Sequence, residues 1–129
     1  MTAPSLGPPA DELVSIDVVE SGSTVSVTAV GEIDSTTAPL LREQLDLILD
    51  RGVPEFVVDL GRVTFLDSAG LCVLAAAHRR AVRQDARMRV LASSRAVIRP
   101  LQITGLWELL HAEQVDGQGP AVPAQQGVA

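Results

Sequence analysis

The residues of this chain that are best placed to do chemistry are Asp67 and Ser68, in the run Phe65-Leu66-Asp67-Ser68-Ala69-Gly70-Leu71. Apolar residues precede them and a helical pattern follows, so we predict that Ser68 lies at or next to the amino-terminal cap of a helix. Helix starts favour anions through their unpaired N–H groups and partial positive charge. A phosphate on Ser68 would bring about −1.5 to −2 charges there. We expect Ala69 and Gly70 to leave the hydroxyl open to a kinase.

The residues alone leave two other roles open for Ser68. Asp67 and Ser68 can be simple capping residues, and composition favours this role because Asp and Ser are common helix caps. Ser68 can also be considered as a catalytic nucleophile, but the Gly-x-Ser-x-Gly pattern of a hydrolase elbow is absent. His78 lies about three turns further along the same predicted helix, which is too far for a general base. We therefore do not expect an enzyme.

The remaining chemistry-bearing residues are few. His78 and His111 are the only histidines and Cys72 is the only cysteine, and their spacing matches no metal site. The chain contains no lysine, so the P-loop signature of nucleotide binding is missing. We expect no metal and no cofactor. A single cysteine cannot form an intramolecular disulfide and fits a reducing compartment.

Hydrophobic periodicity predicts the elements that position Ser68. Strands are expected at 14–18 and 25–29, joined by a hairpin turn at 20–23, because apolar and polar residues alternate there. Capping residues at 31–37 predict the start of a helix that Gly52 and Pro54 end near Arg51. The nearly continuous apolar run 56–60 predicts a central strand that is covered on both faces.

The second half of the chain continues the alternation of strands and helices. A helix is predicted at 68–83, a strand at 88–92, and a short or kinked element after Ser94 because Pro100 interrupts the pattern. The fold class is therefore α/β: a single domain with a mixed sheet that opens with an antiparallel hairpin and has helices packed on it. We expect the domain to span residues 12–113, with flexible tails at 1–11 and 114–129.

Composition excludes several classes of function. Hydrophobic residues make up 47% of the 129 residues but aromatic residues only 2%, so the core must be aliphatic and no stacking platform for nucleic-acid bases exists. A net charge of −6 disfavours nucleic acid and anionic membranes as partners. No apolar segment approaches the roughly 20 residues that span a bilayer, and we expect a cytoplasmic protein. Seven of the ten arginines lie between Arg79 and Arg99; a solvated helix face and loop explain them best, although they could help to dock an acidic partner.

Over residues 13–112 the chain resembles the STAS family, and in particular the bacterial anti-sigma factor antagonists. The segments GEIDSTTAPLL at 31–41 and VVDLGRVTFLDSAGLCVL at 57–74 carry the resemblance, and RPLQITGLWELL at 99–110 adds a weaker match. Two features depart from the family pattern. Pro100 lies within the expected late helix, and the further helix with which family members commonly end is not apparent from Gln114 onwards.

The resemblance implies a STAS-like fold and a function in transcription regulation by partner switching during stress. Such a protein binds an anti-sigma factor that is also a serine kinase, which releases a sigma factor. Phosphorylation of Ser68 switches binding off, and a metal-dependent serine phosphatase restores it. The loop of Asp34, Ser35 and Thr36 is implied to contact the kinase, and Asp67 to position the acceptor.

The expected partner-binding set groups two neighbouring turns: Asp34, Ser35, Thr36, Asp67, Ser68, Ala69, Gly70 and Leu71. The resemblance also implies a monomer or weak dimer. A second possibility remains open, in which the domain is a scaffold or a small-ligand sensor in a larger signalling assembly and is not phosphorylated.

Overall fold

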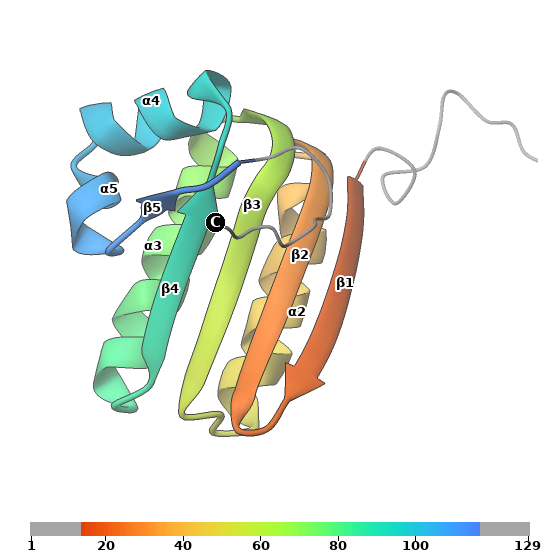
Figure 1. Ribbon diagram of the computed structural model, residues 1–129, viewed down its shortest axis with the longest axis vertical. Coiled ribbons are helices and arrows are strands. Elements are labelled where there is room, and N and C mark those ends of the chain that lie inside the picture. The colour runs from red at the N-terminus through yellow and green to blue at the C-terminus, as the bar shows by residue number, and fades with distance from the viewer. Residues whose placement is uncertain (1–13, 117–129) are drawn as a thin grey trace, which may run out of the picture.

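A five-stranded sheet in the order β1-β2-β3-β4-β5 carries the residues of the predicted site (Figure 1). The structure is a computed structural model that describes residues 14–116. Its elements, in chain order, are β1 Val14–Ser21, β2 Thr24–Ile33, α2 Ala38–Asp50, β3 Glu55–Leu66, α3 Ser68–Arg83, β4 Arg87–Ala92, α4 Arg95–Ile103, α5 Leu106–Leu109 and β5 Glu113–Gln114. No helix within this part of the chain is long and apolar enough to cross a bilayer.

The sheet is mixed, as predicted. β1 pairs antiparallel with β2, whereas β2, β3, β4 and β5 pair in parallel. β3 continues beyond the predicted 56–60 to Leu66, and it contains two register shifts relative to β2. Each shift adds one residue to β3, which is the signature of a β-bulge. One bulge lies after Asp59, whose carboxylate accepts a hydrogen bond from the Gly61 N–H at 2.9 Å.

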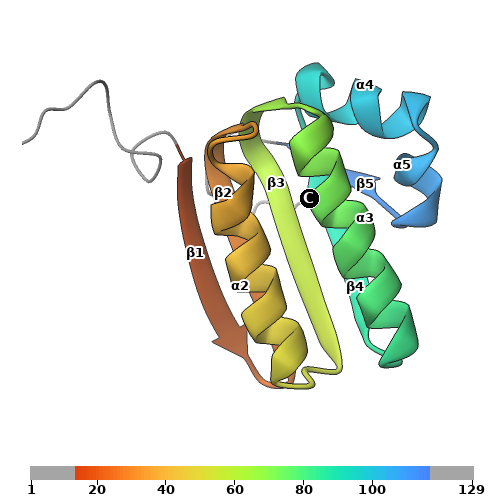
Figure 2. The ribbon, with the colours of Figure 1, turned by 180° about the vertical axis from the view of Figure 1, so that it is seen from behind.

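Helices α2 and α3 lie side by side on one face of the sheet (Figure 2). Their apolar stripes bury aliphatic residues against the strands, which confirms the predicted aliphatic core. A polar contact also joins the two helices: the Arg80 guanidinium on α3 pairs with Asp46 and Asp50 on α2. The Gln84 amide donates to the Leu49 carbonyl at 2.9 Å. These contacts link the carboxyl-terminal ends of α2 and α3, the ends away from Ser68.

The prediction that the central strand is covered on both faces is wrong for the described residues. β3 is central, but Phe56 and Val58 are fully buried while Val57 and Asp59 between them are only half-buried. α2 and α3 cover one face of the sheet, and within residues 14–116 no helix lies over most of β2 and β3 on the other face (Figures 1 and 2). A run of valines does not distinguish a doubly covered strand from a half-covered one, because β-branched residues suit both.

The carboxyl-terminal part contains a short helix and a short strand. Pro100 lies inside α4, which ends at Ile103. The short element predicted after Ser94 is therefore confirmed. The predicted tail 114–129 is wrong at its first residue, because Gln114 belongs to β5 and pairs with Ala92. The local sequence does not predict a strand here, and β5 forms because its backbone pairs with β4. Residues 1–11 and 117–129 of the predicted tails lie outside the described part of the chain.

Candidate functional site

Two turns at the same end of the sheet form the candidate site. One follows β2 and contains Asp34, and the other follows β3 and contains Asp67 and Ser68. The Asp67 N–H donates a hydrogen bond to the Ile33 carbonyl at 3.1 Å, so the backbones of the two turns are joined directly. Parallel strands bring successive strand-to-helix turns to one edge in this way, and such edges commonly carry functional sites.

Asp67 is the amino-terminal cap of α3. Its backbone is extended, and its carboxylate accepts hydrogen bonds from the Ala69 N–H at 2.9 Å and the Gly70 N–H at 3.3 Å. The helix therefore begins at Ser68, which confirms that this serine lies next to the cap. Ser68 is exposed, and within residues 14–116 its hydroxyl has no hydrogen-bond partner. Because Asp67 alone does the capping, the Ser68 hydroxyl is left available at the surface.

Removal of the Asp67 cap should destabilise the domain. For Asp67→Ala we expect a loss of about 1 kcal/mol in the free energy of unfolding, because two N–H groups at the helix start lose their acceptor. Asp67→Asn should stay within a few tenths of a kcal/mol of the parent, since an amide oxygen also caps. Urea denaturation followed by circular dichroism measures both. Equal stabilities for the alanine and asparagine variants would contradict the capping role.

Gly70 packs closely against the ends of two strands. It is buried, and a Cβ at this position would lie 2.9 Å from Ile33 Cγ2 and still closer to Leu66 Cδ1. Leu66 and Ile33 are themselves 3% and 0% exposed. Gly70 therefore lets α3 approach the ends of β2 and β3 closely. This packing role was not predicted from the sequence; that Gly70 also leaves the Ser68 hydroxyl open to a partner stays a prediction.

The Asp34 turn is held by its own side chains. Asp34 Oδ1 accepts hydrogen bonds from the Thr36 N–H at 2.9 Å and the Thr37 N–H at 3.1 Å. These backbone donors lower the pKa of the Asp34 carboxyl below its usual value, so the group is ionised at neutral pH. Thr37 is fully buried; its hydroxyl donates to the Glu32 carbonyl at 2.7 Å and accepts from the Asp34 N–H at 2.9 Å.

The structure brings the two predicted groups of site residues together. Ser35 and Ala69 line one groove between α2 and α3, whose walls also include Pro39 and Cys72. Ser35, Thr36 and Ser68 are exposed, whereas Asp34, Asp67 and Ala69 are half-buried. Leu71 is half-buried and packs on the core.

Sequence reasoning did not single out Thr37. Its place in a run of capping residues is the only signal, and burial of its hydroxyl depends on the tertiary fold. Phe65 belongs to the Ser68 motif, but nothing in the motif predicts that its side chain is exposed.

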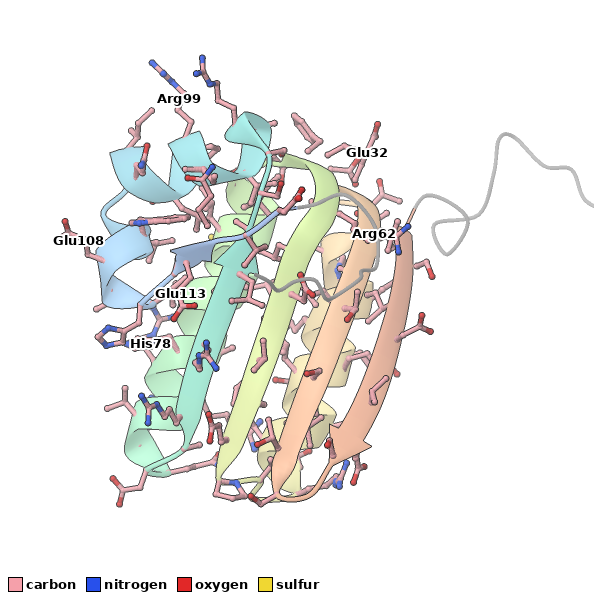
Figure 3. The ribbon with its side chains drawn as sticks, viewed as in Figure 1. Glu32, Arg62, His78, Arg99, Glu108 and Glu113 are labelled. Atoms are coloured by element: carbon pink, nitrogen blue, oxygen red, sulfur yellow. The ribbon has the colours of Figure 1, made fainter. Side chains whose placement is uncertain are left out.

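The two histidines lie elsewhere. His78 is half-buried on α3 and His111 is exposed, and both line a hollow of about 510 Å³. His78 lies near Glu113, well away from the end of the molecule that carries Glu32 and Arg99 (Figure 3). Among the described residues no cluster of three or more His, Cys, Asp or Glu side chains is arranged to hold a metal ion. The hollow is thus separate from the Ser68 turn.

The chain belongs to the STAS domain family, whose model matches residues 15–116. It is similar to the anti-sigma-B factor antagonist of Bacillus subtilis, with 30% identity over 75% of this chain and 88% of that protein. The anti-sigma-F factor antagonist RsfB of Mycobacterium tuberculosis is also 30% identical, over 75% of this chain and 79% of RsfB.

Among solved structures, an anti-sigma factor antagonist from Mycobacterium paratuberculosis superposes with a TM-score of 0.73 at 31% identity. The match covers 83% of this chain and 89% of that one. These likenesses confirm the family and the fold that the sequence motifs predict.

Proposed function

We propose that this chain is an anti-sigma factor antagonist whose binding is switched by phosphorylation of Ser68. The observation that carries the proposal is the exposed Ser68 hydroxyl, which has no partner within residues 14–116 and stands at the first position of α3. The neighbouring cap belongs to Asp67, so phosphorylation of Ser68 removes no hydrogen bond of the fold. Relatives with 30% identity carry the name of anti-sigma factor antagonist, which supports the same assignment.

In the proposed cycle, the unmodified chain binds an anti-sigma factor that is also a serine kinase, and a sigma factor is released. The kinase transfers the γ-phosphoryl group of ATP to Ser68 Oγ: the Oγ–P bond forms, the bond from the γ-phosphorus to the bridging oxygen breaks, ADP leaves, and the hydroxyl proton passes to a base of the kinase. A serine phosphatase hydrolyses the phosphoserine and restores the hydroxyl. This chain supplies the acceptor and the contact surface.

Local electrostatics support a switch without a change of fold. A phosphate on Ser68 stands beside the Asp67 carboxylate and next to the turn that contains the ionised Asp34. The added group is tolerated by the start of α3, where the helix dipole favours negative charge. In a protein interface the same group must lose water and repels nearby carboxylates. The fold therefore survives phosphorylation while the interface is weakened.

The proposal is tested by incubating the purified chain with ATP and each purified anti-sigma factor kinase of the source organism. Mass spectrometry of the digested chain should locate one phosphate on Ser68. Ser68→Ala, which keeps the cap and the core, should take up no phosphate under the same conditions. A phosphate found only on Thr64, Ser93 or Ser94, or the absence of any phosphate, would contradict the assignment.

A further inference from the structure

A β-bulge turns a phenylalanine out of the core close to Ser68. β3 contains one more residue than β2 between Val63 and Phe65, namely Thr64. If Thr64 occupied a regular strand position and no bulge were present, alternation from the buried Val63 would place Phe65 in the core and Leu66 outside. With the bulge, Leu66 is 3% exposed and Phe65 is 45% exposed. Bulges that redirect a side chain in this way are typical of functional positions.

α4 presents a second set of apolar residues beside Phe65. Its buried face consists of Val97, Ile98 and Leu101, which pack on the core. A surface helix usually carries polar residues on the opposite face. Here Ala96, Pro100 and Ile103 follow one another at helical spacing, and Ile103 is 75% exposed, the largest value among the exposed large apolar residues described. Together with Phe65 they line one shallow groove.

Two arginines border this groove. Arg95 and Arg99 are exposed and line it together with the apolar residues. Neither forms an ion pair within residues 14–116; four other described arginines share this property, so it is their place beside the apolar residues that distinguishes Arg95 and Arg99. Arg99 points away from the sheet at the end of the molecule that also carries Glu32 at the end of β2 (Figure 3). An otherwise acidic chain therefore offers an apolar groove with two cations, neither paired by a described carboxylate, next to the Ser68 turn.

We propose that this groove, defined by Phe65, Ala96, Pro100 and Ile103 and bordered by Arg95 and Arg99, is a second part of the surface that binds the anti-sigma factor. This inference rests on the proposed function. The matching partner surface carries an apolar side chain that enters the groove and carboxylates that face the arginines. Apolar anchors give affinity at such a contact, whereas complementary charges give orientation and association rate.

The charges favour a different protein over a second copy of this chain as the occupant. In a two-fold symmetric dimer through this groove, Arg95 and Arg99 of one copy would lie close to the same residues of the other. Like charges that face each other across an interface are unfavourable. The position of the groove favours the anti-sigma factor as the occupant. Leu66 lines the groove, and only Asp67 separates it from Ser68. One partner can therefore cover both the groove and Ser68.

The test measures binding by surface plasmon resonance to the anti-sigma factor kinase that phosphorylates Ser68. Phe65→Ser and Ile103→Ser should each weaken binding about tenfold or more, as truncation of an interface anchor does. Arg95→Glu combined with Arg99→Glu should slow association and reduce its dependence on salt. Val82→Ser and Arg83→Glu, exposed at the other end of α3, are the matched controls and should bind as the parent does. Thermal melting monitored by circular dichroism establishes that each variant is folded.

The outcomes separate this inference from the proposed function. If the parent chain binds and Phe65→Ser and Ile103→Ser bind equally well, the groove proposal is overturned and the proposed function stands. If no anti-sigma factor kinase binds or phosphorylates the parent chain, both are overturned. If sedimentation velocity shows a dimer of the parent that Phe65→Ser dissociates, the groove holds a second copy, which also overturns the proposal.

Discussion

The chain phosphorylated on Ser68 is expected to bind its anti-sigma factor about a hundredfold more weakly than the unmodified chain, a difference of about 3 kcal/mol. The phosphate must be desolvated in the interface, and it stands beside Asp67 and the turn of Asp34, whose lowered pKa keeps it ionised at neutral pH. Isothermal titration calorimetry with the modified and unmodified chains measures the difference.

Three variants separate charge from size. Ser68→Ala should bind as the unmodified chain does and resist the kinase, and Ser68→Asp should bind more weakly because it adds one negative charge. Asp34→Asn keeps an oxygen to accept from Thr36 and Thr37 but removes a charge, so phosphorylation should weaken its binding less. Equal affinities for the phosphorylated and unmodified parent would contradict the switch.

Gly70→Ala should destabilise the domain by about 1–3 kcal/mol, although alanine is the better helix former. The new methyl group would meet Leu66 and Ile33, both buried at the ends of β3 and β2. That overlap forces α3 away from the sheet or displaces a core side chain. The free energy of unfolding from urea denaturation gives the effect.

A double-mutant cycle tests the cause of that loss. Leu66→Ala alone should cost about 2–5 kcal/mol because it leaves a cavity. In the variant that combines Gly70→Ala with Leu66→Ala, the methyl group added at position 70 occupies part of this space. The double variant should therefore lose at least about 1 kcal/mol less free energy of unfolding than the sum of the losses of the two single variants. Strict additivity would show that Leu66 does not limit the space at Gly70.

Most elements of this fold could be predicted because their signals are local. The hairpin of β1 and β2 follows from alternation, and the ends of α2 follow from capping residues at 31–37 and from Gly52 and Pro54. The length of β3 could not be predicted, because its continuation past Gly61 depends on bulges that pairing with β2 stabilises. Nor could the sequence predict that no described helix covers most of β2 and β3 on the second face of the sheet, since burial of a strand depends on the neighbouring layer.

The site could be predicted only in part. A capped serine at a strand-to-helix turn follows from the residues around Asp67, and the structure places Ser68 there. The proposed role of Ser68 as a phosphate acceptor rests on family resemblance, because capping alone accounts for the same residue types. The packing of Gly70 and the exposure of Phe65 could not be predicted from the sequence. Both depend on the register of β3 against β2, which no periodicity in the motif reveals.

The hydrogen bond from Asp67 to the Ile33 carbonyl has a consequence for protein engineering. It joins the turns after β2 and β3 through their backbones, so that a change of backbone in one turn is expected to displace the other. Exchange of only one turn between two antagonists of this family should misalign the unchanged one. Under the proposed function, retargeting this chain to another anti-sigma factor should require that both turns be transplanted together, with Thr37, whose hydrogen bonds hold the first turn.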